Sequence, residues 1–148
     1  MPADAICITT NGFVKNNGEA VMGAGIAKEA AYRFPNLPKE LGRMINKYGN
    51  RLHAFWNMYE IYDGESGDVI FEDIITFPVK HNWWEMADME LIRKSCHELI
   101  HHCNEGYWKN VLLPRPGCGN GRLQWQDVKR EIEPILDDRI SVVTFYKS

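Results

Sequence analysis

The chain lacks several features that would place it in a specialised class of protein. In its 148 residues, no apolar run approaches the roughly 20 residues that a membrane-spanning helix needs. The N-terminus has no basic segment followed by a long apolar one, so we expect no signal peptide. Four cysteines are present, but their spacing is not that of a disulfide scaffold, which indicates a reducing compartment. These absences predict a cytoplasmic protein without a membrane partner.

An excess of positive charge is also missing. Lysine and arginine number 17 and the acidic residues 20, so the formal net charge is -3. This balance argues against a strongly basic nucleic-acid-binding surface, although it permits a local basic groove. The composition is 45% hydrophobic and 25% charged, as in ordinary globular proteins. With no repeat, linker or low-complexity tract, residues 1–148 are expected to form one domain.

Apolar patterning predicts an alternation of strands and helices. Short apolar segments predict strands at 5–10, 51–62, 69–77, 111–113 and 140–146. Helical spacing predicts helices at 23–34, 38–48, 88–103 and 125–136. The polar cluster at 63–68 predicts a turn that joins the second and third strands as a hairpin. Such an order predicts an α/β sandwich with ligands bound at the carboxyl ends of the strands.

Two glycine-rich segments are the most informative feature of the sequence. We call residues 11–27 the first glycine loop and residues 113–123 the second glycine loop. Each follows a predicted strand and leads into a predicted helix, so backbone N–H groups and a helix N-terminus surround a space suited to phosphate. Either loop alone would equally well be a structural turn. Together they predict a ligand with two phosphates, such as a nucleotide diphosphate sugar.

The residues of both loops resemble the macro domain family. The resemblance is carried by Thr9-Thr10-Asn11-Gly12, by residues 23–27 and by residues 114–125, and it covers nearly the whole chain. It is nearest to stand-alone phage and bacterial macro domains and to the antitoxin macro domain that removes ADP-ribose from DNA thymidine. It implies a three-layer α/β/α fold with a mixed central sheet and an ADP-ribose cleft across the strand ends. ADP-ribose or an ADP-ribosylated macromolecule would be the partner, with no cofactor, and the oligomeric state is left open.

The resemblance also implies roles for individual residues. Asn11 would contact the distal ribose. The small residues that would border the pyrophosphate and distal ribose are Gly23, Ala24, Gly25 and Ile26. The residues that would wrap the diphosphate from the other side are Gly117, Cys118, Gly119, Asn120, Gly121 and Arg122. A thiol near a helix start can have a lowered pKa, but we interpret Cys118 as a small residue that fits the loop and not as a nucleophile.

Lys80 is the candidate catalytic residue. The segment 76–84 resembles the Phe-Pro-Thr-Lys stretch of the DNA-acting macro domains, whose lysine is implicated in hydrolysis. An amine attacks only when neutral, so it would need burial or a cationic neighbour near pH 7, whereas a diphosphate would keep it charged. Lys80 could therefore attack the anomeric carbon or position the distal ribose; from the residues alone, a solvated lysine is the alternative. Trp83 and Trp84, beside it, are placed to line a substrate entrance.

Two departures from the family pattern bear on function. The chain begins after the position of the usual first strand and its Gly-Asp-Ile or Gly-Asn-Ile turn, which lies beside the adenine in the family; Asp4 is the nearest acid. Relatives that act on glutamate carry an aspartate where Gly121 stands, and its absence agrees with the thymidine-acting branch. We expect either an ADP-ribosyl glycohydrolase acting on a nucleic-acid or protein target, or a non-catalytic ADP-ribose-binding module.

One motif points to another class of protein. Residues 97–101 match H-E-x-x-H, in which His97 and His101 on one helix face would hold zinc and Glu98 would act as general base. Asn104 stands where the extended pattern has glycine, and no convincing third ligand follows. Both histidines also lie off the apolar face of the predicted helix, so an exposed polar face is favoured. We expect no metal and keep a small zinc hydrolase as the alternative.

Overall fold

A five-stranded mixed sheet forms the centre of the protein. The computed structural model describes residues 3–56, 61–62, 69–71 and 73–144. The sheet has the order β2-β5-β1-β6-β7, and only β2 runs antiparallel to its neighbour. Its strands are β1 (Ala5–Asn11), β2 (His53–Phe55), β5 (Asp73–Lys80), β6 (Val111–Pro114) and β7 (Ile140–Val143). A separate antiparallel pair is formed by β3 (Ile61–Tyr62) and β4 (Val69–Phe71).

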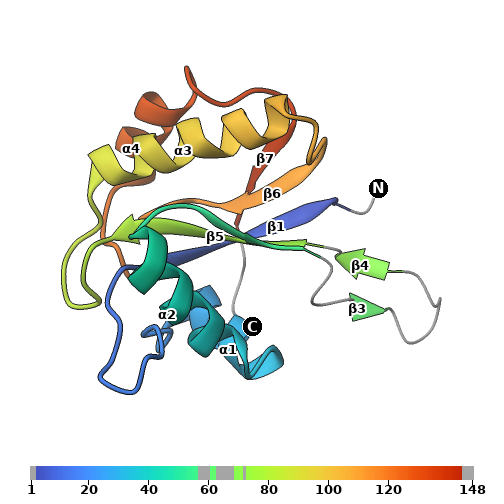
Figure 1. Ribbon diagram of the computed structural model, residues 1–148. Helices are drawn as coiled ribbons and strands as arrows, with labels where there is room; N and C mark the ends of the chain where they lie inside the picture. Colours follow the sequence, from blue (N-terminus) through green and yellow to red (C-terminus); the bar gives the residue numbers. More distant parts are fainter. Residues whose placement is uncertain (1–2, 57–60, 63–68, 72, 145–148) are drawn as a thin grey trace.

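Helices cover both faces of this sheet. Within the described ranges they are α1 (Gly25–Arg33), α2 (Leu37–Tyr48), α3 (Met89–Asn104) and α4 (Trp125–Ile132). Figure 1 shows α1 and α2 on one face and α3 and α4 on the other. The three-layer α/β/α sandwich expected from the sequence is thereby confirmed. In the described part of the chain, no helix combines the length and hydrophobicity needed to cross a bilayer.

The sheet separates two hydrophobic cores. Along β5, Ile75 and Phe77 belong to the core beneath α3 and α4, whereas Ile74 belongs to the core beneath α1 and α2. Successive side chains of a strand point to opposite faces, so a strand covered on both sides is expected to be mainly apolar. The mainly apolar composition of 5–10 and of 74–79 therefore follows from their central positions in the sheet.

Several predicted boundaries are wrong. The predicted strand at 51–62 is divided between β2 and β3, and the one at 69–77 between β4 and β5, because hydrophobicity alone does not show where a strand leaves the main sheet. The predicted turn at 63–68 lies outside the described residues, although β3 and β4 pair as a hairpin requires. The last helix ends at Ile132 instead of 136, just before Pro134, and β7 ends at Val143. Of the predicted final strand, residues 145–146 lie outside the described ranges.

Candidate functional site

Three loops meet at one edge of the sheet. The strands β1, β5 and β6 run parallel, so their carboxyl ends lie at the same edge. There the two glycine loops and the segment 80–88, which we call the Lys80 loop, enclose a cleft of about 1170 Å³. Every residue that the sequence analysis singled out for the site lines this cleft: Asn11, Gly23, Ala24, Gly25, Ile26, Lys80, Gly117, Cys118, Gly119, Asn120, Gly121 and Arg122. The structure thus brings them together, and their roles toward a ligand remain predictions.

Asn11 lies beside Lys80 in the lining of the cleft. A register shift after Thr10 pairs Asn11 with Lys80 across the neighbouring strands. The Asn11 side chain donates from Nδ2 to the Val21 carbonyl over 3.0 Å and accepts from the Phe13 N–H over 2.9 Å. Asn11 therefore holds both halves of the first glycine loop in place, in addition to facing the cleft.

Helix α2 supports the first glycine loop from outside the cleft. The Ala20 N–H donates to the Pro38 carbonyl at the start of α2 over 2.8 Å. Gly42 lies directly against the Gly18 carbonyl oxygen, and a Cβ at this position would collide with it. A glycine is thus required on α2 for the loop to approach this closely.

The N-terminus of α1 opens into the cleft. Its first residue, Gly25, has φ +57°, and the preceding Ala24 forms no side-chain capping bond. The first turn also contains no acidic residue, so its N–H groups and the helix dipole are available to an anion. A Cβ at Gly25 would lie 3.1 Å from Nδ2 of Asn120. The two glycine loops therefore approach each other closely at this point of the cleft.

The second glycine loop packs tightly on the Lys80 loop. The Ala87 N–H donates to the Gly121 carbonyl over 3.0 Å, and a Cβ at Gly121 would lie 2.8 Å from Cβ of Ala87. Gly117, with φ +76°, would likewise collide with Ala87 and Ile92 if it carried a Cβ. Arg122 adopts φ +64° without being glycine, a sparsely populated conformation that is enriched at functional sites. This packing fixes the position of the second glycine loop, which carries residues that are predicted to contact the ligand.

Cys118 is not activated in this loop. Burial raises the pKa of its thiol, and the nearby positive charge of Arg115 opposes this effect only in part. The lowered pKa that a helix start can induce is therefore not found. A thiol that stays protonated agrees with our interpretation of Cys118 as a small residue that fits the loop.

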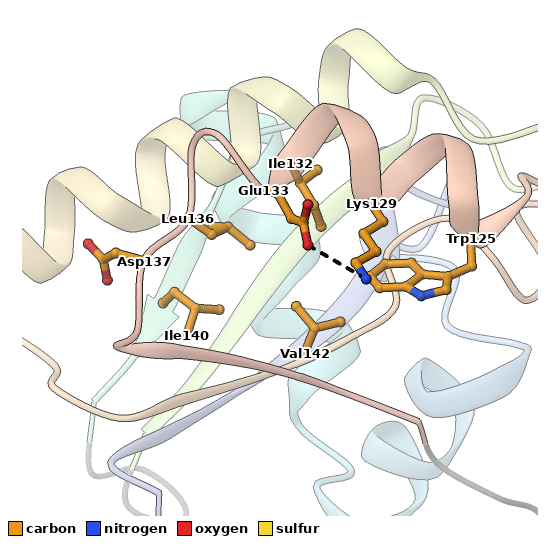
Figure 2. Close-up of a pocket in the computed structure, with 8 residues that line it drawn as sticks. All are labelled: Trp125, Lys129, Ile132, Glu133, Leu136, Asp137, Ile140 and Val142. Carbon is orange, nitrogen blue, oxygen red and sulfur yellow. Dashed lines mark ion pairs between the residues drawn. The ribbon is translucent and has the colours of Figure 1, made fainter.

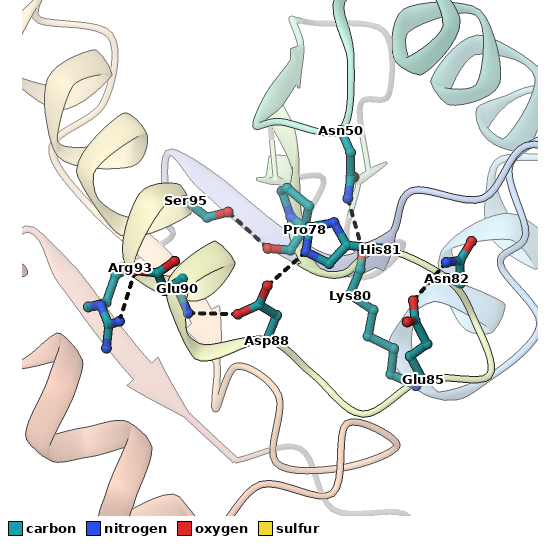
Figure 3. Close-up of polar contacts among 10 residues, drawn as sticks. All are labelled: Asn50, Pro78, Lys80, His81, Asn82, Glu85, Asp88, Glu90, Arg93 and Ser95. Atoms are coloured by element: carbon teal, nitrogen blue, oxygen red, sulfur yellow. Dashed lines mark hydrogen bonds and ion pairs between the residues drawn. The ribbon is translucent and has the colours of Figure 1, made fainter.

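Lys80 has both features that favour a neutral amine. Burial lowers the pKa of its side chain, and the positive charge of Arg122 lowers it further. Its Nζ donates to the main-chain carbonyl of Trp83 over 3.3 Å. Its own carbonyl accepts from Nδ2 of Asn50 over 2.9 Å (Figure 3). Hydrogen bonds therefore hold both the side chain and the main chain of Lys80, and its side chain is partly buried. The residue type alone would instead suggest a freely solvated lysine.

Polar contacts at both ends define the Lys80 loop. His81 Nε2 lies 2.8 Å from Asp88 Oδ2, and Asp88 Oδ1 accepts from the Glu90 N–H at the start of α3 over 3.0 Å. Between them, the Asn82 side chain donates to Glu85 over 2.7 Å; Figure 3 shows these contacts together. The loop is therefore braced at its ends and in its middle.

The cleft is also lined by residues that the sequence analysis did not assign to it. Glu29 and Arg115 are the charged ones among them, with Glu85. The Arg115 guanidinium lies over the ring of Trp125, 4.8 Å from its centroid. Glu29 follows Gly25 by four residues, a helical spacing that places both on one side of α1. That spacing was the available signal for Glu29, whereas Arg115 lay within the second glycine loop itself.

The H-E-x-x-H motif does not form a metal centre among the described residues. No group of three or more potential ligands occurs there. His97 is exposed, and His101 pairs with Glu105 over 2.9 Å. Glu98 is engaged by Arg51 over 3.0 Å and accepts from the Leu52 N–H. The motif therefore belongs to the outer face of α3, and the geometry does not support the zinc hydrolase alternative.

A second hollow lies between α4 and β7. It measures about 240 Å³, and its lining combines aliphatic side chains and Trp125 with charged ones, of which Lys129 and Glu133 form an ion pair at 3.7 Å (Figure 2). None of the residues predicted for the site lies in it. The large cleft between the glycine loops is therefore the candidate site.

The fold and the cleft together define an α/β/α domain with a ligand site between two glycine loops. A profile of the Macro domain family matches residues 16–132. The chain belongs to the macro domain family.

Two bacterial proteins are similar to most of the chain. A DNA ADP-ribosyl glycohydrolase of Thermus aquaticus is 33% identical over 137 residues, which are 92% of this chain and 35% of that protein. A protein of the same name from Mycobacterium tuberculosis is 29% identical over 117 residues, 78% of this chain and 32% of its own length. The chain thus spans about a third of the length of these relatives.

Solved structures show the same fold. The macrodomain of Mycobacterium tuberculosis DarG superposes with a TM-score of 0.74 at 23% identity, covering 100% of this chain and 91% of that one. Thermosipho africanus DarTG in complex with ADP-ribose gives a TM-score of 0.74 at 20% identity, covering 95% of this chain and 37% of that one. These likenesses confirm the fold expected from the sequence.

Proposed function

We propose that the cleft binds ADP-ribose and that the domain hydrolyses the bond between ADP-ribose and a modified macromolecule, with DNA as the target. The observation that carries this proposal is the convergence of both glycine loops, the uncapped N-terminus of α1 and Lys80 on one cleft. Support for DNA comes from the two bacterial relatives described above, which bear the name DNA ADP-ribosyl glycohydrolase.

The binding half of the proposal follows from the backbone. Loop N–H groups and a helix N-terminus favour a diphosphate, and Arg115 and Arg122 add positive charge to the lining. If Asn11 contacts the distal ribose, as the family resemblance implies, its pairing with Lys80 would bring that ribose near the amine. ADP-ribose would thus present the anomeric carbon of its distal ribose to Lys80, the proposed nucleophile.

The chemical half assigns the first step to Lys80. Its neutral Nζ attacks the anomeric carbon of the distal ribose, the bond to the base breaks, and the amine proton goes to the leaving base. Water then adds to the same carbon, the bond to Nζ breaks, and the amine regains its proton. The net reaction consumes one water and releases free ADP-ribose and the unmodified base.

Calorimetric titration with ADP-ribose tests the binding half. We expect a dissociation constant in the low micromolar range, about -8 kcal/mol, with weak binding of AMP and of ribose 5-phosphate because each engages only part of the cleft. Absence of binding at millimolar ADP-ribose would refute the proposal.

Release of ADP-ribose from a modified oligonucleotide tests the chemical half. Lys80→Ala should abolish turnover and retain ADP-ribose binding. Lys80→Arg separates the two roles of the lysine, because arginine keeps the positive charge but is not a nucleophile. Full activity of Lys80→Arg would assign Lys80 to electrostatic positioning. Tight binding of ADP-ribose by a wild-type protein without turnover would identify a binding module.

A further inference from the structure

Two adjacent indole rings lie at the mouth of the cleft. Trp83 and Trp84 belong to its lining, yet 52% and 53% of their surfaces are exposed. In the same loop, Met86 is 51% exposed. A group of large apolar side chains exposed in one place is typical of a binding surface.

These rings are held in a fixed arrangement. Trp84 meets Phe13 of the first glycine loop edge-to-face, with ring centroids 5.5 Å apart, and meets Trp83 in the same way at 5.4 Å. The Glu85 N–H donates to the Asn82 carbonyl over 3.2 Å, and their side chains are also bonded. Hydrogen bonds between Asn82 and Glu85 therefore hold the turn that carries both rings. Trp83 packs against Trp84, which Phe13 supports.

Trp83 is adjacent to the proposed nucleophile. The Lys80 Nζ donates to the main-chain carbonyl of Trp83, so the amine and this residue share one corner of the cleft. If the anomeric carbon lies at the Lys80 amine, the group that leaves it departs into the space beside Trp83. A nucleobase has a flat aromatic face that stacks on indole, whereas the carboxylate that leaves an ADP-ribosylated glutamate has none.

We propose that the indole of Trp83 stacks on the base that carries the ADP-ribosyl group and thereby selects base-linked over ester-linked ADP-ribose. This inference rests on the proposed function, because it needs ADP-ribose in the cleft with its distal ribose at Lys80. Trp84 acts as a positioning residue that supports the Trp83 ring from the side of Phe13.

Equilibrium binding tests the stacking directly. In a Lys80→Arg background, which prevents turnover through the amine, the probes are ADP-ribose and a short single-stranded oligonucleotide with one ADP-ribosylated base. Trp83→Ala should weaken binding of the oligonucleotide about tenfold and weaken binding of ADP-ribose far less. Trp83→Phe should restore most of the loss. Tyr48→Ala is the matched control, because Tyr48 is also 52% exposed but lies on α2 away from the cleft lining.

Steady-state kinetics tests the selectivity. With Lys80 intact, Trp83→Ala should raise KM for the oligonucleotide about tenfold and lower kcat/KM far less for ADP-ribose acetylated on its anomeric oxygen, an ester-linked substrate. Equal losses on both substrates, or no loss on either, would overturn the inference. Failure of the proposed function is a separate result, since it appears in the wild-type protein as absence of ADP-ribose binding.

Discussion

The Lys80 amine experiences opposing influences before and after a diphosphate binds. In the free protein, burial and Arg122 lower the pKa of Lys80 from its ordinary value of 10.5. Bound diphosphate stabilises the charged form and raises the pKa again. Because only the neutral amine attacks, activity should rise with pH through this pKa in both states, but at a lower pH in the free protein.

A pH profile of hydrolysis checks this expectation. The profile of kcat/KM reports the free protein and that of kcat the complex, so kcat/KM should have its inflexion below 10.5 and kcat a more alkaline one. Arg122→Gln should move the kcat/KM inflexion to higher pH, because it removes a neighbouring positive charge. An unchanged inflexion in Arg122→Gln would contradict the assignment.

Two glycines of the second loop form a matched pair for testing its packing. A Cβ at Gly121 meets the Gly117 carbonyl and Ala87, whereas a Cβ at Gly119 has no atom within 4 Å. Gly121→Ala should therefore lower the free energy of unfolding by about 1–3 kcal/mol, and Gly119→Ala should leave it unchanged. Chemical denaturation measures both variants. Equal stabilities would mean that the second loop and the Lys80 loop are not tightly packed.

Single residues of the site were predictable where a motif carried them, and their partners were not. The sequence pointed to Lys80 and to both glycine loops, and the structure gathers them in one cleft. It gave no sign that Arg122 acts on the charge of Lys80, because that proximity arises only when the segments that follow β5 and β6 come together across the end of β1. It also missed that the Asn11 amide is bonded within its own loop.

Asp88 links the Lys80 loop to the start of α3. The hydrogen bond from His81 is the main cause that lowers the Asp88 pKa from its ordinary value. Because the pKa of Asp88 is lowered, its carboxylate stabilises the fold fully at pH values above the ordinary pKa of 3.8. This stabilisation is lost as the pH falls through the lowered pKa. Asp88→Ala, which also removes the helix cap, should cost about 1 kcal/mol at pH 7.

Asp88→Asn is the control for this prediction. Asparagine keeps the cap but replaces the carboxylate that faces His81 Nε2 with a neutral amide, so it should cost only a few tenths of a kcal/mol. The difference in the free energy of unfolding between wild type and Asp88→Asn should vanish at acidic pH, where the protonated Asp88 and the asparagine that replaces it are both neutral. Urea denaturation at several pH values measures it. A difference that persists in acid would exclude charge as its cause.

Elements were predictable in kind and less so in extent. The helix from Met89 had a cap and one apolar face, and it was expected at nearly its observed length. The segment 51–62 was expected as one strand, but among its described residues only His53–Phe55 pair with β5. Its aromatic composition is typical of strands throughout, whereas the end of a strand depends on its partner. The local sequence pattern therefore defines the kind of element, whereas tertiary pairing defines its length.

The two cores share one sheet, so ligand binding at its edge should stabilise the whole domain. We expect thermal unfolding to be a single transition, and ADP-ribose at about 100 times its dissociation constant to add about 2.7 kcal/mol to the free energy of unfolding. AMP and ribose 5-phosphate at the same concentration should add much less. Differential scanning calorimetry measures this. Two separate transitions, only one of them moved by ADP-ribose, would show that the two cores unfold independently.

The order of strands in the sheet has a consequence for synthesis on the ribosome. The central strand β1 is made before the other described strands, but its neighbours are β5 and β6: Ala5 pairs with Asp73 and with Val111. Pairing between segments so distant in sequence is slow, because a long stretch of chain must be closed first. During translation β1 is therefore an apolar strand with two unpaired edges, and the nascent chain needs protection from aggregation until β6 has emerged.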